Sequence, residues 1–314
     1  NGVASALADP TKRMITFNGD GAVSGITGDE AVIAALGDSV GLGLAGLWNA
    51  GQPIELAQLR VVGKALTAGL SGNIDGGGFR GRIGLQTDNI APFSALAGRD
   101  LTGALSLDAE GSLAFIGGGF DLTFDGSGNN LTIDDPTADA LLAGNVALSG
   151  RLARTPAGLV ADDFAITNPQ VQFTADGVYG TAEANFAIGL DLSDLGLLSD
   201  QASGALKVRG TAKSTSAEAP VVLALDANVA DGRLIDRTLR DAKLGLNLDV
   251  LGGKVTGSVD GSAMLDGYQA TLSSQIAVDE VQQALKDLNF EIAGTRIFGS
   301  VSRAVDTALM TGRL

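Results

Sequence analysis

The residues that could support catalysis are few, because this chain of 314 residues contains neither histidine nor cysteine. Ser–His–Asp triads, cysteine nucleophiles and imidazole or thiolate metal sites are therefore excluded. Gly37-Asp38-Ser39-Val40-Gly41 does match the G-x-S-x-G motif of hydrolases. That motif follows a strand, opens a helix and needs a histidine base, whereas here a helical pattern precedes the motif and a strand pattern follows it. We expect the protein not to be an enzyme.

A second motif, G-x-G-x-x-G, occurs at 41–46. In dinucleotide-binding proteins this motif follows a strand, opens a helix and is followed by an acidic residue about 20 positions later. A strand pattern follows this copy, and Lys64 and Leu66 lie near the position where the acid is expected. The glycines are better explained as small residues of a sheet, and we expect no cofactor.

A third motif, Asp125-Gly126-Ser127-Gly128-Asn129-Asn130, is similar to the start of a calcium-binding loop. Such a loop requires glycine at its sixth position and glutamate at its twelfth, which are Asn130 and Pro136 here. The stretch favours a plain Gly/Asn turn, with calcium binding as a minor alternative. We expect no metal site.

Composition limits the partners. The net charge is −15 with a pI near 4.3, so the chain repels phosphates and we expect no nucleic-acid partner. Hydrophobic residues make up 45% of the chain but aromatic residues only 4%, and there are 45 glycines. This apolar content argues against disorder.

Alternation of apolar and polar residues is the main structural signal. Successive residues of a strand point to opposite faces, so each alternating segment predicts a strand with one apolar and one polar face. In one segment Phe120, Leu122 and Phe124 alternate with Asp121, Thr123 and Asp125. The candidate apolar-groove residues are Leu105, Leu107, Phe120, Leu122, Phe124, Val146, Leu148, Val171, Phe173, Phe186, Ile188, Leu190, Leu223, Leu225, Leu244, Leu246 and Leu248.

Connections between these strands are predicted from turn and helix signals. Asp-Gly pairs at 20, 75, 125, 176, 231 and 266 predict turns. Short helices are predicted at 30–36, 136–143, 280–288 and 303–310, the second capped by Asp135 and closed by Gly144. About 22 strands at ~4.8 Å spacing would give a sheet roughly 100 Å long.

Internal repetition is visible at an offset of about one hundred residues. The stretch 92–112 matches 193–213, and 30–46 loosely matches 138–154. We interpret the chain as repeats at 29–133 and 136–234 with a degenerate third at 235–314, all within one continuous sheet over 1–314.

The predicted fold is all-β: a long antiparallel sheet curled into an open, taco-like trough with a few short helices. Four short helices cannot cover the apolar face of such a sheet. A closed β-solenoid, as in secreted adhesins or autotransporter passengers, is the alternative fold and function. A set of transmembrane β-barrel strands would need aromatic girdles, which one Trp and two Tyr cannot supply.

Three stretches carry a family resemblance: 101–113 (LTGALSLDAEGSL), 140–180 and 231–276. Their Leu, Gly and Asp patterns resemble the repeat body of alphaproteobacterial-type TamB proteins, which belong to the AsmA-like family of bridge-like lipid conduits. The resemblance covers nearly all of the chain, and its motifs are patterns shared with related AsmA-like proteins.

The resemblance implies a protein anchored in the inner membrane of a Gram-negative bacterium that crosses the periplasm. It implies phospholipid acyl chains as cargo, a role in outer-membrane biogenesis, and a TamA-type outer-membrane barrel as partner through a C-terminal domain missing here. A scaffold role in outer-membrane protein assembly is an alternative. Because Asn1 opens no signal peptide and Leu314 ends in mid-pattern, we interpret the chain as a middle piece of a longer protein.

Overall fold

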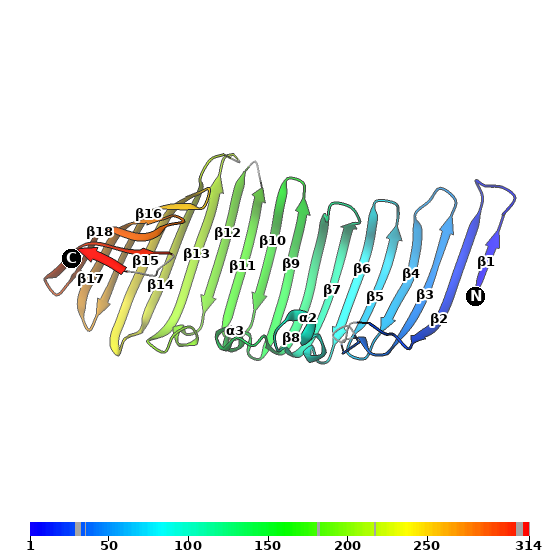
Figure 1. The fold of residues 1–314 in the computed structure, drawn as a ribbon, viewed down its shortest axis with the longest axis horizontal. Coiled ribbons are helices and arrows are strands. Elements are labelled where there is room, and N and C mark those ends of the chain that lie inside the picture. Colours follow the sequence, from blue (N-terminus) through cyan, green and yellow to red (C-terminus); the bar gives the residue numbers. More distant parts are fainter. Residues whose placement is uncertain (29–32, 35, 181–182, 217, 306–309, 314) are drawn as a thin grey trace. The chain divides into compact units, whose positions relative to one another are not determined.

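The structure is a computed structural model that describes residues 1–28, 33–34, 36–180, 183–216, 218–305 and 310–313. It is 69% strand and 7% helix, and its 20 strands form one antiparallel sheet that does not close on itself (Figure 1). The predicted all-β class, an open sheet with a few short helices, is confirmed. The closed β-solenoid is wrong as a fold, and the strand count is slightly below the expected number.

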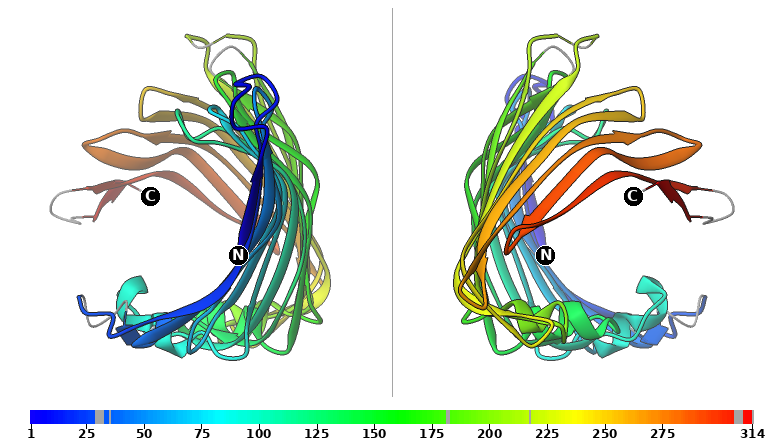
Figure 2. Two further views of the ribbon diagram at one scale, coloured as in Figure 1. Left: turned by 90° about the vertical axis from the view of Figure 1, so that its right-hand side faces the viewer. Right: turned by 90° about the vertical axis from the view of Figure 1, so that its left-hand side faces the viewer.

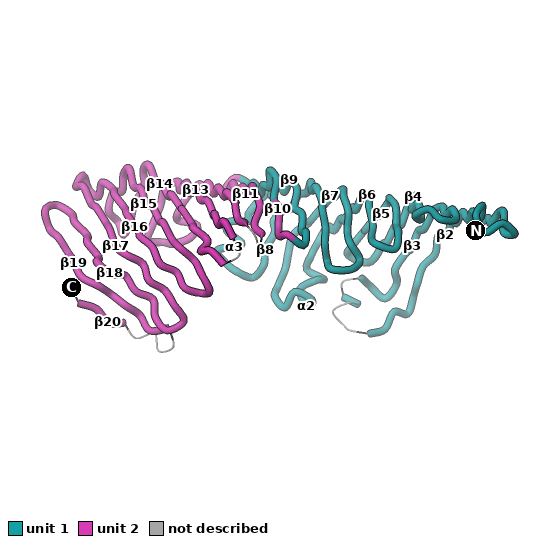
Figure 3. Tube along the Cα trace, turned by 90° about the horizontal axis from the view of Figure 1, so that it is seen from above, with its two compact units in different colours: residues 1–156, 161–168 teal, residues 157–160, 169–314 magenta. Residues whose placement is uncertain are grey.

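The chain divides into two compact units (Figure 3). Unit 1 comprises Asn1–Pro156 and Ala161–Asn168, and unit 2 comprises Ala157–Val160 and Pro169–Leu314. The strands of unit 1 are β1 (Gly2–Ser5), β2 (Met14–Ser24), β3 (Ser39–Asn49), β4 (Ile54–Val62), β5 (Thr67–Ile74), β6 (Gly78–Thr87), β7 (Thr102–Ala114), β8 (Phe120–Thr132), β9 (Asn145–Thr155) and most of β10 (Gly158–Thr167). Its short helices are η1 (Ala91–Phe93), α2 (Ser94–Ala97) and α3 (Pro136–Leu142).

Unit 2 continues the same kind of meander. Its elements are β11 (Val171–Gly180), β12 (Ala184–Leu192), η2 (Leu195–Leu197), β13 (Ala202–Ser214), β14 (Val221–Leu234), β15 (Arg237–Leu251), β16 (Lys254–Leu265), β17 (Tyr268–Val278), β18 (Gln282–Ile292), β19 (Thr295–Ala304) and β20 (Met310–Arg313). Within each unit, every strand from β1 to β9 and from β11 to β20 pairs antiparallel with the next strand along the chain.

The strands of each unit are bowed along their length (Figure 2). Glycine allows two of the sharpest departures from regular strand geometry. Gly111 in β7 has φ 151°, and a Cβ atom there would lie 1.9 Å from the Asp121 carbonyl oxygen. Gly177 in β11 has φ 123°, and its Cβ would lie 2.1 Å from the Asn185 carbonyl oxygen. Only glycine fits these positions, because any side chain would collide with the neighbouring backbone.

The helix predictions are right at one place. The Asp135 carboxylate accepts hydrogen bonds from the backbone N–H groups of Thr137 (3.0 Å) and Ala138 (2.9 Å), so it caps α3 as expected. Gly144 follows the helix with φ 83°. The predicted helix at 30–36 lies mostly outside the described residues; its described residues, 33, 34 and 36, are helical.

Two helix predictions are wrong. Residues 282–288 belong to β18, and Asp279 instead caps a turn by accepting hydrogen bonds from Val281 and Gln282. Residues 303–304 end β19 and β20 begins at Met310, while 306–309 lie outside the described residues. In 282–288 pairing with the neighbouring strands outweighs a local helix signal that is only about two turns long.

Asp-Gly pairs predicted turns correctly at 75 and 266 and wrongly at 20, 125, 176 and 231, which lie inside strands. In these strands the aspartate faces the polar side, and at three of the four sites the neighbouring strand leaves no room for a Cβ on the glycine. A Cβ at Gly126, for example, would lie 2.9 Å from Leu107 Cδ1. The stretch 125–130 is consequently the middle of β8, and neither the predicted turn nor a calcium loop forms there.

The matching stretches 92–112 and 193–213 have corresponding structures. Each contains a short helical turn followed by a strand, β7 in one case and β13 in the other. Gly103 (φ 107°) and Gly204 (φ 109°) occupy equivalent positions, and the strand register shifts at both. The repeat boundaries themselves stay a prediction.

Candidate functional site

The predicted groove residues of unit 1 lie on one face of its sheet. Directly opposed residues of antiparallel strands point to the same side. Leu107 is opposite Gly126, which is opposite Leu148, and Leu105 and Val146 both face Gly128. This apolar face of unit 1 is defined by Ile15, Phe17, Val40, Leu42, Leu44, Trp48, Leu56, Leu59, Leu70, Phe79, Ile83, Leu85, Leu105, Leu107, Leu113, Phe120, Leu122, Phe124, Val146, Leu148 and Leu152.

All ten predicted groove residues of unit 2 also share one face. One of its rows runs across seven strands, β11 to β17, as Ala175, Ile188, Gly210, Leu225, Leu246, Val259 and Ser274. The apolar face of unit 2 is defined by Val171, Phe173, Phe186, Ile188, Leu190, Leu192, Leu206, Val208, Leu223, Leu225, Leu244, Leu246, Leu248, Val259, Leu272 and Ile276. The alternation pattern therefore assigned strand faces correctly in both units.

Sequence reasoning missed the part of the apolar face that β2–β6 provide. Trp48, the single tryptophan of the chain, lies opposite Ile15 on this face. The signal was present in Val40, Leu42 and Leu44, which alternate with small residues. Glycines inside these strands and bulges on both sides of β4 hide the pattern.

In the described part of the chain, no second layer covers the apolar faces. Strands in substantial contact are neighbours in the sheet, and α3 and η2 contact only the adjoining β8 and β13. As a result, large aliphatic side chains remain open: Leu42 is 38% exposed, Leu44 42%, Ile188 36% and Leu244 38%. Contiguous exposed apolar surface of this kind is unusual in a protein without a binding partner.

Charge is absent from the middle of the apolar face of unit 2. The rows that cross β14 and β15 from Val221 to Val229 contain only apolar and glycine partners among the paired residues. The one buried polar side chain on this side, Ser274, donates a hydrogen bond to the Lys286 carbonyl oxygen (2.9 Å) at a bulge. Nothing polar is therefore left unsatisfied there for a ligand to bind.

Charged side chains gather on the opposite face, which we call the polar face. In unit 1 Arg151 of β9 donates hydrogen bonds to Asp121 of β8 (2.6 and 2.9 Å) and to Asp162 of β10. In unit 2 Arg209 of β13 donates to Asp191 of β12 (2.5 and 3.1 Å). The arginine hydrogen bonds are the largest cause that lowers the pKa of Asp121 and of Asp191. These pairs tie neighbouring strands together.

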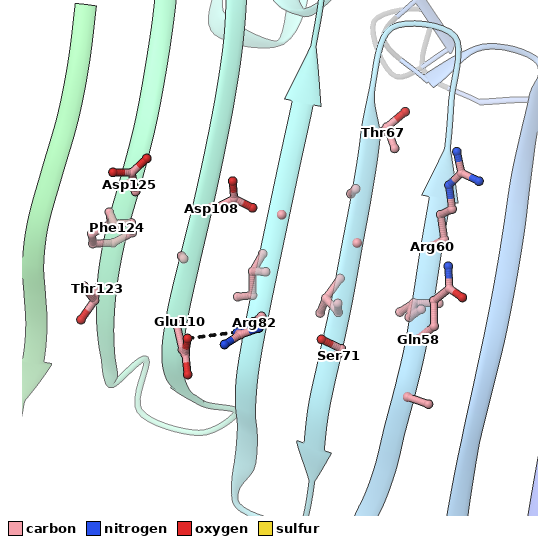
Figure 4. Close-up of a pocket in the computed structure, with 18 residues that line it drawn as sticks. Gln58, Arg60, Thr67, Ser71, Arg82, Asp108, Glu110, Thr123, Phe124 and Asp125 are labelled. Carbon is pink, nitrogen blue, oxygen red and sulfur yellow. Dashed lines mark hydrogen bonds and ion pairs between the residues drawn. The ribbon is translucent and has the colours of Figure 1, made fainter.

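A hollow of about 880 Å³ in unit 1 is lined in part by two rows of the polar face (Figure 4). One row contains Arg60, Asp108 and Asp125, and the other contains Arg82 and Glu110, which form a 3.1 Å ion pair. A Cβ at Gly69 would meet nothing within 4 Å, so there is empty space in the hollow above this glycine. In the described residues no group of three or more acidic side chains could hold a metal ion. The hollow is also lined by four residues of the apolar face, Leu59, Leu70, Ile83 and Phe124.

Comparison with known proteins adds no relative. No protein family model, no curated protein and no solved structure matches this chain. Within the described residues, no helix combines the length and apolar character needed to cross a membrane.

Proposed function

We propose that this protein is a hydrophobic conduit that carries phospholipids between the inner and outer membranes of a Gram-negative envelope. The acyl chains would lie along the apolar faces of units 1 and 2, and the headgroups would stay in water. The observation that supports the proposal is the uncovered apolar face, with rows of partly exposed Leu, Ile and Val in both units.

The magnitude of the barrier explains why such a surface is useful. Exposing one CH₂ group to water costs about 0.8 kcal/mol, so moving two sixteen-carbon chains through water costs on the order of 25 kcal/mol. Contact with an aliphatic surface offsets much of this cost at every step. A continuous apolar surface can therefore lower the barrier without any chemical reaction.

The composition of the surface suits movement along it. Leu, Val, Ala and Ile dominate the apolar rows of unit 2, so successive rows offer similar contacts. Specific pockets usually combine aromatic side chains with a few fixed polar groups, which these rows lack. A lipid would then meet no single position of much higher affinity. The net charge of −15 is carried largely away from the apolar rows and keeps the exposed sheet in solution.

The proposed cellular setting depends on the TamB-like resemblance of 101–113, 140–180 and 231–276. The resemblance implies that the chain acts in the periplasm as part of a protein that is anchored in the inner membrane and contributes to outer-membrane biogenesis. A TamA-type barrel would be the partner through a domain outside this sequence. No step of this proposal requires catalysis.

Lipid transfer between vesicles tests the proposal. Phosphatidylcholine donor vesicles carrying a fluorescent phospholipid are mixed with unlabelled acceptor vesicles, with and without the protein. We expect the protein to accelerate transfer and the emission of Trp48, on the apolar face, to shift to shorter wavelength when lipid binds. Unchanged transfer together with unchanged emission would contradict the proposal.

A further inference from the structure

One row of the apolar face of unit 1 contains a charge. The row runs through Ile54, Ile74, Phe79, Leu113, Phe120 and Arg154. Arg154 is the only charged residue among the paired residues of the apolar rows of β2–β9. Arg154 lies one residue before the end of β9 and is exposed, so this row of apolar side chains carries a cation that is open to water.

This guanidinium has no anionic partner. Arg154 is exposed, and its side chain forms no ion pair or hydrogen bond with the residues that the structure describes. The nearest acid along β8, Asp121, points to the polar face and is bound by Arg151. Three residues apart on one strand, the two arginines thus differ: Arg151 is saturated by two carboxylates and Arg154 is free.

Arg154 pairs with Phe120 and lies beside the β7–β8 connection. Its Nη1 atom lies 3.9 Å from the position that a Cβ would take at Gly118, in the β7–β8 connection. That connection also carries Phe115, which is 57% exposed, and Ile116, which is 84% exposed. The Phe115 amide donates to the Gly77 carbonyl oxygen (3.1 Å), which holds the connection against the neighbouring β5–β6 turn. The cation therefore belongs to the apolar row and lies beside a connection that carries two exposed apolar side chains.

We propose that Arg154 binds the phosphate of a diacyl lipid whose acyl chains lie on the apolar face of unit 1. This inference rests on the proposed function and assigns to it a headgroup-selecting residue. A guanidinium can donate two parallel hydrogen bonds to a phosphate, a geometry that neutral headgroups cannot match. Contacts with the apolar row provide most of the lipid affinity, and Arg154 provides the preference for a headgroup that carries a phosphate.

The inferred ligand is a lipid and not free phosphate. An isolated arginine–anion pair in water contributes little, and the net charge of −15 opposes anions in general. At physiological ionic strength charges further than about 8 Å from Arg154 are largely screened. A phosphate brought to this position by its acyl chains thus interacts mainly with the local cation.

Binding of short-chain lipids tests the inference. Dioctanoyl phosphatidic acid and dioctanoylglycerol, below their micelle concentrations, are titrated into the whole chain at 0.15 M salt and followed by calorimetry. We expect the wild type to bind the phosphatidic acid about fivefold more tightly, the scale of one exposed charged contact. Arg154→Gln should remove this preference, and Arg154→Lys should keep part of it. Arg60→Gln, on the polar face of the same unit, should leave it unchanged.

The outcomes separate the two proposals. Equal binding of both lipids by the wild type overturns the role of Arg154 and leaves acyl-chain binding in place. Binding of neither lipid overturns both proposals. If sn-glycerol 3-phosphate binds as tightly as the phosphatidic acid, the site recognises free phosphate and the inference is wrong. Thermal melting of Arg154→Gln confirms that the variant is folded, as the exposure of Arg154 leads us to expect.

Discussion

Units 1 and 2 build the same apolar face from different residues. In unit 1 a row of three glycines, Gly72, Gly81 and Gly111, crosses β5, β6 and β7. In unit 2 the row through Leu225, Leu246 and Val259 crosses β14, β15 and β16 with large side chains. This row of unit 1 therefore presents no side chains over three strands, whereas the row of unit 2 presents large aliphatic side chains over three strands.

In both units the alternation of apolar and polar residues decides which face of the sheet is apolar. The size of the side chains decides how much apolar contact area that face offers. Glycine rows permit strongly bent strands and close backbone approach, but they bury little apolar area. Leucine rows give more contact area per strand, at about 25 cal/mol for each Å². We therefore expect unit 2 to bind acyl chains more tightly and unit 1 to be more sensitive to changes at its glycines.

A charge in the filled rows should have the largest effect on lipid binding. Leu246→Arg puts a guanidinium in the middle of the unit 2 row, where desolvating it costs several kcal/mol, so lipid affinity should fall roughly hundredfold. Because the sheet is one layer thick, the side chain can reach water, and folding should weaken by only about 1–2 kcal/mol. Asp249→Arg on the polar face is the control for charge. Ile83→Arg in unit 1 should reduce affinity less, and an equal loss in both units would remove the distinction between them.

Strained glycines should have the largest effect on stability. Gly111→Ala in unit 1 and Gly177→Ala in unit 2 each force a Cβ against a neighbouring carbonyl at positive φ, so we expect losses of about 2–4 kcal/mol in the free energy of unfolding. Gly19→Ala is the control, because its Cβ would meet nothing within 4 Å. Urea unfolding followed by circular dichroism measures all three. Similar midpoints for Gly111→Ala and Gly19→Ala would show that β7 does not need glycine.

Acid sensitivity distinguishes the ion pairs of the two units. Arg151 lowers the pKa of Asp121 in the folded protein. The ion pair therefore stabilises the fold fully above about pH 4, and this stabilisation is lost as the pH falls through the lowered pKa of Asp121. Asp121→Asn should therefore reduce stability at pH 7 and flatten its decline below pH 4. Asp191→Asn should do the same to a smaller extent, because Arg209 pairs with one carboxylate and Arg151 with two. Melting temperatures from pH 2 to 7 provide the test. Identical pH profiles of wild type and Asp121→Asn would contradict it.

Filling a glycine of unit 1 should have the smallest effect. Gly21→Leu on the apolar face and Gly69→Leu on the polar face both replace a glycine whose Cβ meets nothing within 4 Å. Each should raise stability by about 0.5–1 kcal/mol, because a strand glycine is entropically unfavourable. Only Gly21→Leu should also increase lipid affinity. An increase in lipid affinity in both variants would show that the gain comes from higher stability and not from added apolar surface on the apolar face.

The sequence predicts the face of each strand well because the period of two is a direct consequence of strand geometry. The groove residues of β7–β9 and β11–β15 all fall on the expected side. The sequence predicts the connections between strands less well. Asp-Gly at 125 and 176 has the composition of a turn, yet each glycine lies in a strand where a neighbouring strand needs its small size.

Other features depend on contacts that local pattern does not contain. The segment 282–288 has a helix-like cap at Asp279 but forms part of β18, since β17 pairs with residues 283–286 and β19 pairs with 282–285 and 288. The free Arg154 could not be distinguished from the saturated Arg151, because the partners of Arg151 lie 30 and 11 residues away in the chain. Such long-range pairing becomes visible only in the folded sheet.

A photo-crosslinking scan along one strand tests the central claim most directly. A photoreactive amino acid is placed in turn at each position from Lys243 to Asp249 of β15, and the protein is irradiated with a radiolabelled phospholipid. We expect labelling with a period of two along the strand, strong at 244, 246 and 248 and weak at 243, 245, 247 and 249. Equal labelling at all seven positions, or labelling confined to the odd-numbered ones, would contradict acyl-chain binding on the apolar face.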